Sequence, residues 1–134
     1  MPADRRARVL VADDHKLLLD RVVKTLAEEF CVVATVSDGA QLLVAEDQYH
    51  PDVLVVDVCM PGMSGIEAAA FIRRRGSHAA VVCLTAYEET EMIEAAWEAG
   101  ALGYVTKACL ASDLVPAIRA ALEGRRFVSA PVSR

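Results

Sequence analysis

Four short apolar runs of the sequence are followed at once by side chains that can bind a metal ion or a phosphate. Asp13 and Asp14 follow one run, and Asp57 ends a second. Thr85 and Lys107 end two later runs. Clustered carboxylates repel one another until a hard divalent cation such as Mg²⁺ binds them, and a carboxylate oxygen can attack phosphorus. The residue types therefore indicate metal-assisted phosphoryl chemistry, provided that the fold brings them together.

The placement of the acidic residues suggests a role for each. Asp13 and Asp14 are adjacent at the mouth of one loop, which suits the holding of a metal ion. Asp57 stands alone at the end of an apolar run, before a loop with proline and glycine, so we assign it as the nucleophile. Lys107 would spread the charge of the transferred oxygens, and Thr85 would donate a hydrogen bond to the acyl phosphate. A single aspartate in such a place is usually a turn or cap residue, but the joint pattern is far more specific.

The elements that must position these residues alternate between apolar runs and helical spacing. We predict strands at 9–12, 32–36, 53–56, 80–84 and 103–106, and helices at about 15–30, 38–47, 64–75, 88–99 and 112–123. Strands that alternate with helices indicate an α/β fold with a parallel sheet and right-handed crossovers. Functional loops of such a sheet lie beyond the carboxyl ends of its strands, so the residues above would line one pocket.

Capping residues mark several helix starts. Asp38, with Gln41 three residues on, opens the second predicted helix, and Ser64 with Glu67 forms a capping box before the third. Pro116 is placed in the first turn of the last predicted helix, where its missing N–H costs little.

Composition limits the class of protein. The chain has 134 residues, of which 54% are hydrophobic and 25% charged, as expected for one globular domain. Its net charge of -5 makes it a poor direct binder of nucleic acid. No apolar run approaches the ~20 residues that span a bilayer, and the N-terminus does not resemble a signal peptide. The four cysteines lack disulfide or zinc spacing, so we expect a cytoplasmic protein with no membrane partner.

Four segments together resemble, in order, the receiver domains of two-component response regulators. They are Val11–His15, Pro51–Gly65, Leu84–Ala86 and Gly103–Lys107. The match covers about residues 8–124. The Ala-Asp-Asp-His opening and the stretch Ala99–Tyr104 resemble the subfamily that carries a LuxR-type helix-turn-helix effector.

This resemblance implies a flavodoxin-like (CheY-like) doubly wound α/β fold. Its five-stranded parallel sheet would have the order 2-1-3-4-5 and would be covered by five helices. It also implies a receiver domain over residues 1–124, followed over residues 125–134 by the start of an interdomain linker or a disordered tail.

The resemblance also implies a chemistry for the pocket. A sensor histidine kinase, or a small phosphodonor, would pass a phosphoryl group to Asp57. The cofactor Mg²⁺ would be held by Asp14 and Asp57 directly, by the backbone carbonyl of Cys59, and by Asp13 through water. The domain would catalyse only its own phosphorylation and dephosphorylation, and would otherwise not be an enzyme.

A response to phosphorylation is implied as well. Lys107 would pair with the phosphoryl group, Thr85 would turn toward it, and Tyr104 would swing inward behind it. The output would be transcription regulation, with a homodimer formed on phosphorylation and DNA contacted only through a C-terminal effector. The alternative is a stand-alone or phosphorylation-independent receiver that acts through protein contacts.

Two nearby residues bear on how long the phosphate would last. Cys59 lies two residues past the nucleophile, and Tyr87 two past Thr85. These positions tune hydrolysis in the family, so we hypothesise that a bulky Tyr87 obstructs water and slows self-dephosphorylation. An exposed Cys59 beside the metal site would also be open to oxidation.

Particular residues argue against two other functions. An aspartyl-phosphate hydrolase wants a second acid two residues beyond the nucleophile, where this chain has Cys59. A flavin-binding electron carrier needs a loop of Ser, Thr and Gly after its first strand, where Asp13 and Asp14 would repel a phosphate.

Overall fold

A computed structural model describes residues 6–86 and 90–129 of the chain. These residues form one parallel sheet in the order β2-β1-β3-β4-β5-β6. The strands are β1 (Arg8–Ala12), β2 (Cys31–Val36), β3 (Val53–Asp57), β4 (Ala80–Thr85), β5 (Gly103–Thr106) and β6 (Phe127–Val128). The first five confirm the predicted doubly wound fold and its order 2-1-3-4-5.

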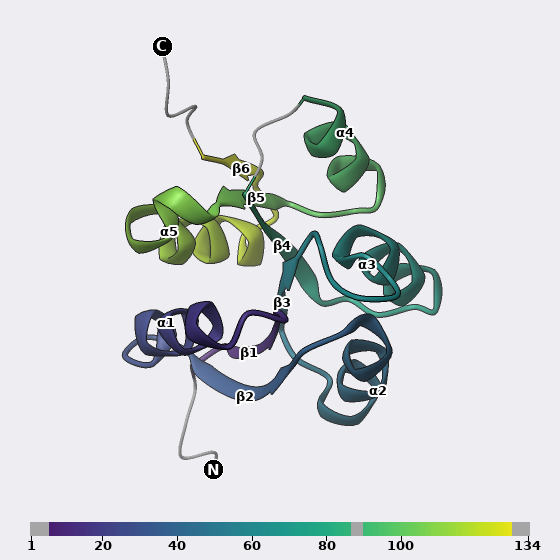
Figure 1. The fold of residues 1–134 in the computed structure, drawn as a ribbon, viewed down its shortest axis with the longest axis horizontal. Helices are drawn as coiled ribbons and strands as arrows, with labels where there is room; N and C mark the ends of the chain where they lie inside the picture. Colours follow the sequence, from purple (N-terminus) through teal and green to yellow (C-terminus); the bar gives the residue numbers. More distant parts are fainter. Residues whose placement is uncertain (1–5, 87–89, 130–134) are drawn as a thin grey trace.

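Helices cover both faces of the sheet. They are α1 (Lys16–Leu26), α2 (Gly39–Tyr49), α3 (Gly65–Arg74), α4 (Thr90–Glu98) and α5 (Leu110–Leu122), with a 3₁₀ turn, η1 (Lys107–Cys109), before α5. Figure 1 shows α1 and α5 on one side, and α2, α3 and α4 on the other. One hydrophobic cluster fills each side, and the strands contribute to both because alternate side chains point to opposite faces.

The helix starts follow the predicted capping residues at α2 and α3. The Asp38 carboxylate accepts a hydrogen bond from the Gln41 N–H at 2.8 Å. Ser64 and Glu67 form both bonds of the capping box. These local bonds satisfy N–H groups that have no partner within the helix, so they fix where each helix begins.

The prediction for Pro116 is wrong. Because η1 runs directly into the last helix and Leu110 is buried, α5 begins at Leu110 instead of Ser112. Pro116 therefore lies in the second turn. Pro116 is exposed, so its ring lies on the solvent side of the helix. The carbonyl group of Ser112, four residues earlier, has no helix N–H to accept from, and Ser112 is exposed to water as well.

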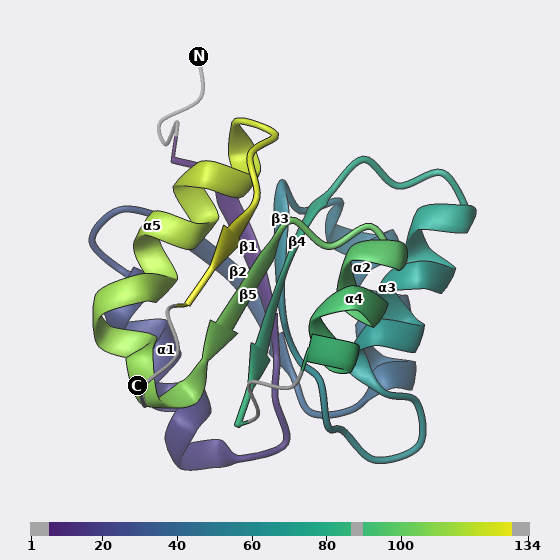
Figure 2. The same cartoon turned by 90° about the horizontal axis from the view of Figure 1, so that it is seen from above.

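The sheet has a sixth strand where five were predicted. Phe127 and Val128, placed by the prediction in a linker or tail, pair in parallel with β5. Phe127 packs against the hydrophobic cluster beneath α1 and α5. A two-residue strand has no readable periodicity, so its place depends on this packing and on backbone bonds to β5. Figure 2 shows β6 running alongside β5 at the edge of the sheet.

Candidate functional site: an acidic pocket at the carboxyl ends of the strands

The parallel strands bring the predicted side chains to one edge of the sheet. Asp13 follows β1, Asp57 ends β3, Thr85 ends β4 and Lys107 follows β5. Every residue of β3 is buried, and Asp57 itself is 2% exposed. The Asp57 carboxylate therefore stands on a rigid, fully packed strand, while Asp14 at the rim remains exposed.

Lys107 connects the two buried carboxylates. Its Nζ atom lies 3.2 Å from Asp57 Oδ2 and 3.5 Å from Asp13 Oδ2. Its side chain is 20% exposed, so the ammonium group is partly shielded from water. One cation at the end of β5 thus faces an acid at the end of β3 and another just after β1. The arrangement can stabilise a further negative group placed between them.

Each buried carboxylate has one oxygen held by a backbone N–H and a second oxygen that, among the described residues, pairs only with the Lys107 ammonium group. The Cys59 N–H donates to Asp57 Oδ1 at 3.1 Å, and the His15 N–H donates to Asp13 Oδ1 at 2.8 Å. Asp13 Oδ2 and Asp57 Oδ2 are buried and, apart from the ion pairs with Lys107, have no hydrogen-bond partner among the described residues. Buried polar atoms are normally satisfied, so these two oxygens mark a place for a ligand.

The electrostatics of the pocket raise the affinity of Asp57 for a proton. Burial, and then the charge of Asp13, raise the pKa of Asp57 to about 6. The bond from the Cys59 N–H and the charge and hydrogen bonding of Lys107 act in the opposite direction. Burial of the carboxylate is the larger cause of the rise, and the neighbouring Asp13 charge adds to it.

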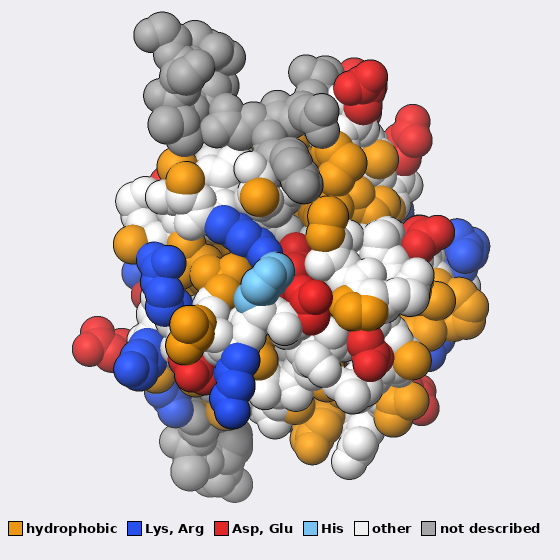
Figure 3. All heavy atoms as spheres, in the orientation of Figure 1, with side chains coloured by type: hydrophobic (Ala, Val, Ile, Leu, Met, Phe, Trp, Pro, Cys, Tyr) orange, Lys and Arg blue, Asp and Glu red, His pale blue; other side chains and the backbone are white. Residues whose placement is uncertain are grey.

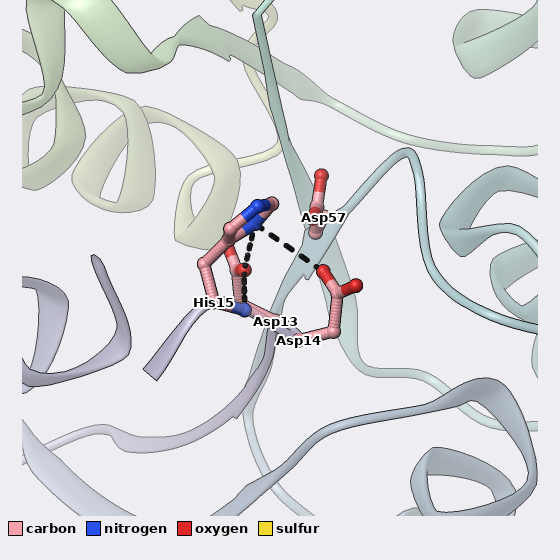
Figure 4. Close-up of side chains that lie close together, drawn as sticks. All are labelled: Asp13, Asp14, His15 and Asp57. Carbon is pink, nitrogen blue, oxygen red and sulfur yellow. Dashed lines mark hydrogen bonds and ion pairs between the residues drawn. The ribbon is translucent and has the colours of Figure 1, made fainter. Parts of the chain in front are cut away.

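His15 also belongs to this pocket, although no role was predicted for it from its place in the sequence. Its Nδ1 lies 3.4 Å from Asp14 Oδ1 and 3.5 Å from Asp13 Oδ1, and its side chain is 69% exposed. Figure 4 shows the imidazole beside the three aspartates, and Figure 3 shows a histidine against acidic side chains on the molecular surface. The adjacency of His15 to Asp14 was visible in the sequence, but neighbours in sequence need not face one another.

The acidic residues fit a hard divalent cation. Potential ligand atoms of Asp13, Asp14, His15 and Asp57 all lie within 4.8 Å of one another. Three of the four are carboxylates, which Mg²⁺ prefers, and two of these carry the unsatisfied buried oxygens described above. A cation there would satisfy those oxygens and offset the mutual repulsion of the acids.

The other predicted site residues fall into three groups. Thr85 is buried. It lies beside the pocket, because its strand partner is Thr106, the residue before Lys107. Tyr104 is 1% exposed, so its side chain already lies inward in this structure. Cys59 is exposed near Asp57, and Tyr87 lies outside the described residues.

A separate groove lies between α2 and α3 and has a volume of about 910 Å³. Pro61, Met63 and Phe71 line it together with charged side chains such as Glu67 and Arg74. Asp13, Asp14 and Asp57 do not line this groove, so the acidic site is distinct from it.

Comparison with known proteins identifies the family. Residues 9–119 match the model of the response regulator receiver domain. The chain belongs to this family. It is similar to the response regulator GacA of Pseudomonas viridiflava, with 35% identity over 129 residues, which is 95% of this chain and 60% of GacA. The chain thus spans about 60% of the length of GacA and of the transcriptional regulatory protein PdtaR of Mycobacterium tuberculosis, to which it is also similar.

Solved structures of receiver domains have the same fold. A LuxR-family two-component response regulator from Aurantimonas sp. superposes with a TM-score of 0.87 at 34% identity, over 91% of this chain and 89% of that one. A structure of RcsB dimers bound to DNA gives 0.84 at 26% identity, over 93% of this chain and 65% of RcsB. The structural neighbours of this receiver domain thus include LuxR-family response regulators, in agreement with the subfamily suggested by its sequence.

Among the helices of residues 6–86 and 90–129, none is both long enough and apolar enough to cross a membrane.

Proposed function

We propose that this receiver domain is a phosphorylation switch whose acceptor is Asp57. The observation that carries the proposal is the Oδ2 atom of Asp57. It is buried and lies 3.2 Å from the Lys107 ammonium group, with no other hydrogen-bond partner among the described residues. An anionic oxygen held this way is directed at the place where a transferred phosphoryl group would meet a positive charge.

The reaction is a transfer from phosphohistidine of a sensor kinase, or from a small phosphodonor. A carboxylate oxygen of Asp57 forms a bond to phosphorus while the bond from phosphorus to the donor breaks, and the donor leaves with the electron pair. Lys107 stabilises the equatorial oxygens of the group in transit. Asp57 must be ionised to attack, and with a pKa of about 6 it is largely ionised near neutral pH.

The cofactor assigned to the pocket is Mg²⁺. Asp14 and Asp57 would hold it directly with the backbone carbonyl of Cys59, and Asp13 would hold it through water. When bound, it supplies positive charge that offsets the repulsion between the acids and the incoming phosphoryl oxygens. The unsatisfied oxygens of Asp13 and Asp57 support this assignment.

Two residues are proposed to report the modification. Thr85, buried at the end of β4, would donate a hydrogen bond to the new phosphate. Tyr104 is packed inward on β5, and the phosphorylated state would favour this position. A phosphate adds about -1.5 to -2 charges, so it can shift a balance between two packings of similar energy.

The output is proposed to be transcription regulation in the cytoplasm. We propose a homodimer that forms on phosphorylation and contacts DNA through a C-terminal effector domain. The solved RcsB dimers bound to DNA support dimerisation and DNA binding as the output. Receiver domains act within signalling proteins, and the domain would catalyse only its own phosphorylation and dephosphorylation. Exposed Cys59, and Tyr87, are proposed to tune the lifetime of the phosphate.

Incubation with acetyl phosphate and Mg²⁺, followed by intact mass, tests the function. We expect a gain of one phosphoryl group that is lost in Asp57→Asn and retained in Asp47→Asn, a change at an exposed aspartate on α2. No adduct from acetyl phosphate or from phosphorylated histidine kinases would favour a receiver that acts through protein contacts alone.

A further inference from the structure

The C-terminal segment of the described chain reaches the active-site strand through one buried side chain. Ser129 follows β6 and is 6% exposed. Its N–H donates to the Tyr104 carbonyl at 2.9 Å, which continues the ladder of β6 on β5. Its hydroxyl oxygen accepts a hydrogen bond from the Thr106 N–H at 3.2 Å. The Ser129 hydroxyl thus accepts from the Thr106 N–H in place of a backbone carbonyl, at the point where the backbone hydrogen bonds between β5 and the C-terminal segment end.

A carboxylate fixes the hydroxyl group in this orientation. Ser129 Oγ donates to Asp113 Oδ2 at 2.8 Å, while the Ser112 hydroxyl donates to Asp113 Oδ1 at 3.1 Å. A hydroxyl that donates to a carboxylate becomes a better acceptor, so the bond from Thr106 is strengthened. The chain of bonds therefore joins β5, the C-terminal segment and the first turn of α5.

The position of this chain of bonds gives it a functional meaning. Thr106 immediately precedes Lys107, whose Nζ atom lies 3.2 Å from Asp57 Oδ2. The backbone at Thr106 is held by its pairing with Thr85 of β4 on one side and by Ser129 on the other. Without the hydrogen bond from Thr106 to Ser129, the start of η1 and the aliphatic part of the Lys107 side chain would be free to shift. A displacement of about 1 Å is enough to slow a reaction whose groups must be correctly oriented.

We propose that Ser129 is a positioning residue for Lys107 in the phosphorylation of Asp57. This inference rests on the proposed function of the pocket and adds to it a residue from the C-terminal segment. The same segment is held from a third direction, since the Arg126 guanidinium stacks 4.8 Å from the centroid of the Trp97 ring on α4. On this proposal, the reaction at Asp57 depends on contacts made by the C-terminal residues 126–129.

The test measures phosphorylation by acetyl phosphate with Mg²⁺ in the full chain, at a range of donor concentrations. Ser129→Ala keeps the backbone bond to Tyr104 and removes both hydroxyl bonds. We expect its maximal rate to fall about three- to tenfold, with a smaller change in the half-saturating concentration, because Lys107 acts in the transition state. Ser129→Thr retains a hydroxyl group and should restore most of the rate. Val128→Ala, at the exposed neighbour on β6, is the matched control and should match the wild type.

A double-mutant cycle separates positioning from general loss of stability. If Ser129 acts through Lys107, then Ser129→Ala should cause no further slowing in a Lys107→Ala background. Multiplicative effects of the two changes would overturn the proposal. Hydrogen exchange of the Thr106 amide, followed by NMR without any phosphodonor, should accelerate in Ser129→Ala and not in Val128→Ala.

The outcomes also separate this inference from the proposed function. A wild-type chain that gains phosphate, with an unchanged rate in Ser129→Ala, would overturn the role of Ser129 alone. Unchanged protection of the Thr106 amide in Ser129→Ala would overturn it as well. A wild-type chain that gains no phosphate would remove the function of the pocket, and with it any role of Ser129 in that reaction.

Discussion

Lys107 Nζ lies 3.2 Å from Asp57 Oδ2, although the two residues come from strands separated by β4. The ammonium group thus reaches across the end of β4 to the buried acid. It also lies 3.5 Å from Asp13 Oδ2, so a single cation offsets part of the charge of two carboxylates. The Lys107 ammonium group thus partly offsets the charge of Asp13 and Asp57 before a metal ion or phosphate binds.

Replacing Lys107 should affect phosphorylation and metal binding in opposite directions. Lys107→Met should slow phosphorylation by acetyl phosphate about a hundredfold, since a preorganised positive charge is lost from the transition state. The same change should tighten Mg²⁺ binding, because a competing cation beside Asp57 and Asp13 is removed. Phosphorylation rates by intact mass and Mg²⁺ titration by calorimetry measure the two effects. Lys24→Met, at an exposed position on α1, should change neither, and weaker Mg²⁺ binding in Lys107→Met would contradict the charge argument.

The raised pKa of Asp57 predicts a stability that falls as pH rises. The folded chain binds the Asp57 proton more tightly than the unfolded chain does, with a pKa of about 6 against 3.8. Stability from this group is therefore fully present below the unfolded pKa and is lost as pH rises through the folded pKa. In magnesium-free buffer, Asp57→Asn should raise the free energy of unfolding by about 3 kcal/mol near pH ~7.5 and by about half as much near pH ~5.

Urea unfolding at the two pH values checks this effect of Asp57. The control Asp47→Asn changes an exposed carboxyl group and should alter stability little at either pH. A gain in Asp57→Asn that is equal at both pH values would show that packing, and not ionisation, is responsible.

Magnesium should stabilise the fold through the acidic pocket. At a Mg²⁺ concentration of about ten times Kd, linkage predicts a gain of about 1.4 kcal/mol in the free energy of unfolding. Asp14→Ala should remove most of this gain, whereas Cys59→Ala should keep it, because only the backbone carbonyl of Cys59 is proposed to bind. Thermal melts with Mg²⁺ and with EDTA measure the difference, and an equal Mg²⁺ effect in Asp14→Ala would exclude that residue as a ligand.

Gly65 should be essential to the position of Asp57. A Cβ atom at Gly65 would lie 2.2 Å from the Asp57 carbonyl oxygen, so α3 would have to move away from β3. Gly65→Ala should cost about 1–3 kcal/mol and should also slow phosphorylation. Gly76→Ala is the comparison, because Gly76 has a φ of +97° but open space around it. That change should cost about 1–2 kcal/mol of backbone strain while leaving the phosphorylation rate unchanged.

Arg75 should stabilise the packing of α3 on α2. Its Nη2 atom donates to Glu46 Oε1 and to the Leu43 carbonyl, each at 2.6 Å, and Glu46 is buried. Arg75→Met would leave a buried carboxylate without its partner, so we expect a loss of about 2–3 kcal/mol in urea unfolding. Arg74→Met, at the exposed neighbour, should cost far less. Equal losses in the two variants would show that the ion pair contributes little.

The sequence was sufficient for features that repeat or that depend on local bonds. The continuous apolar runs marked the five long strands, and the order of acids at their ends predicted the cluster around Asp57. The caps at Asp38 and Ser64 were readable because their partners lie three residues away. These features depend on neighbours in the chain or on the regular geometry of a parallel sheet.

Features set by distant contacts were missed. The hydrogen bonds of Ser129 to Thr106 and Asp113 join residues far apart in the chain, and no pattern in the sequence near Ser129 predicts them. The start of α5 depends on η1 and on the burial of Leu110, and these moved Pro116 out of the first turn. His15 at the pocket depends on the direction of one side chain, which sequence order does not specify.

The short strand β6 has a consequence for aggregation. Without Phe127 and Val128, the outer edge of β5 would present a row of unpaired backbone groups, which is a template for adding a strand from another molecule. A receiver shortened to end at Gly124 would expose the unpaired edge of β5 together with the apolar surface that Phe127 covers. We therefore expect that variant to self-associate at concentrations where a chain ending after Ser129 stays monodisperse, as light scattering would show.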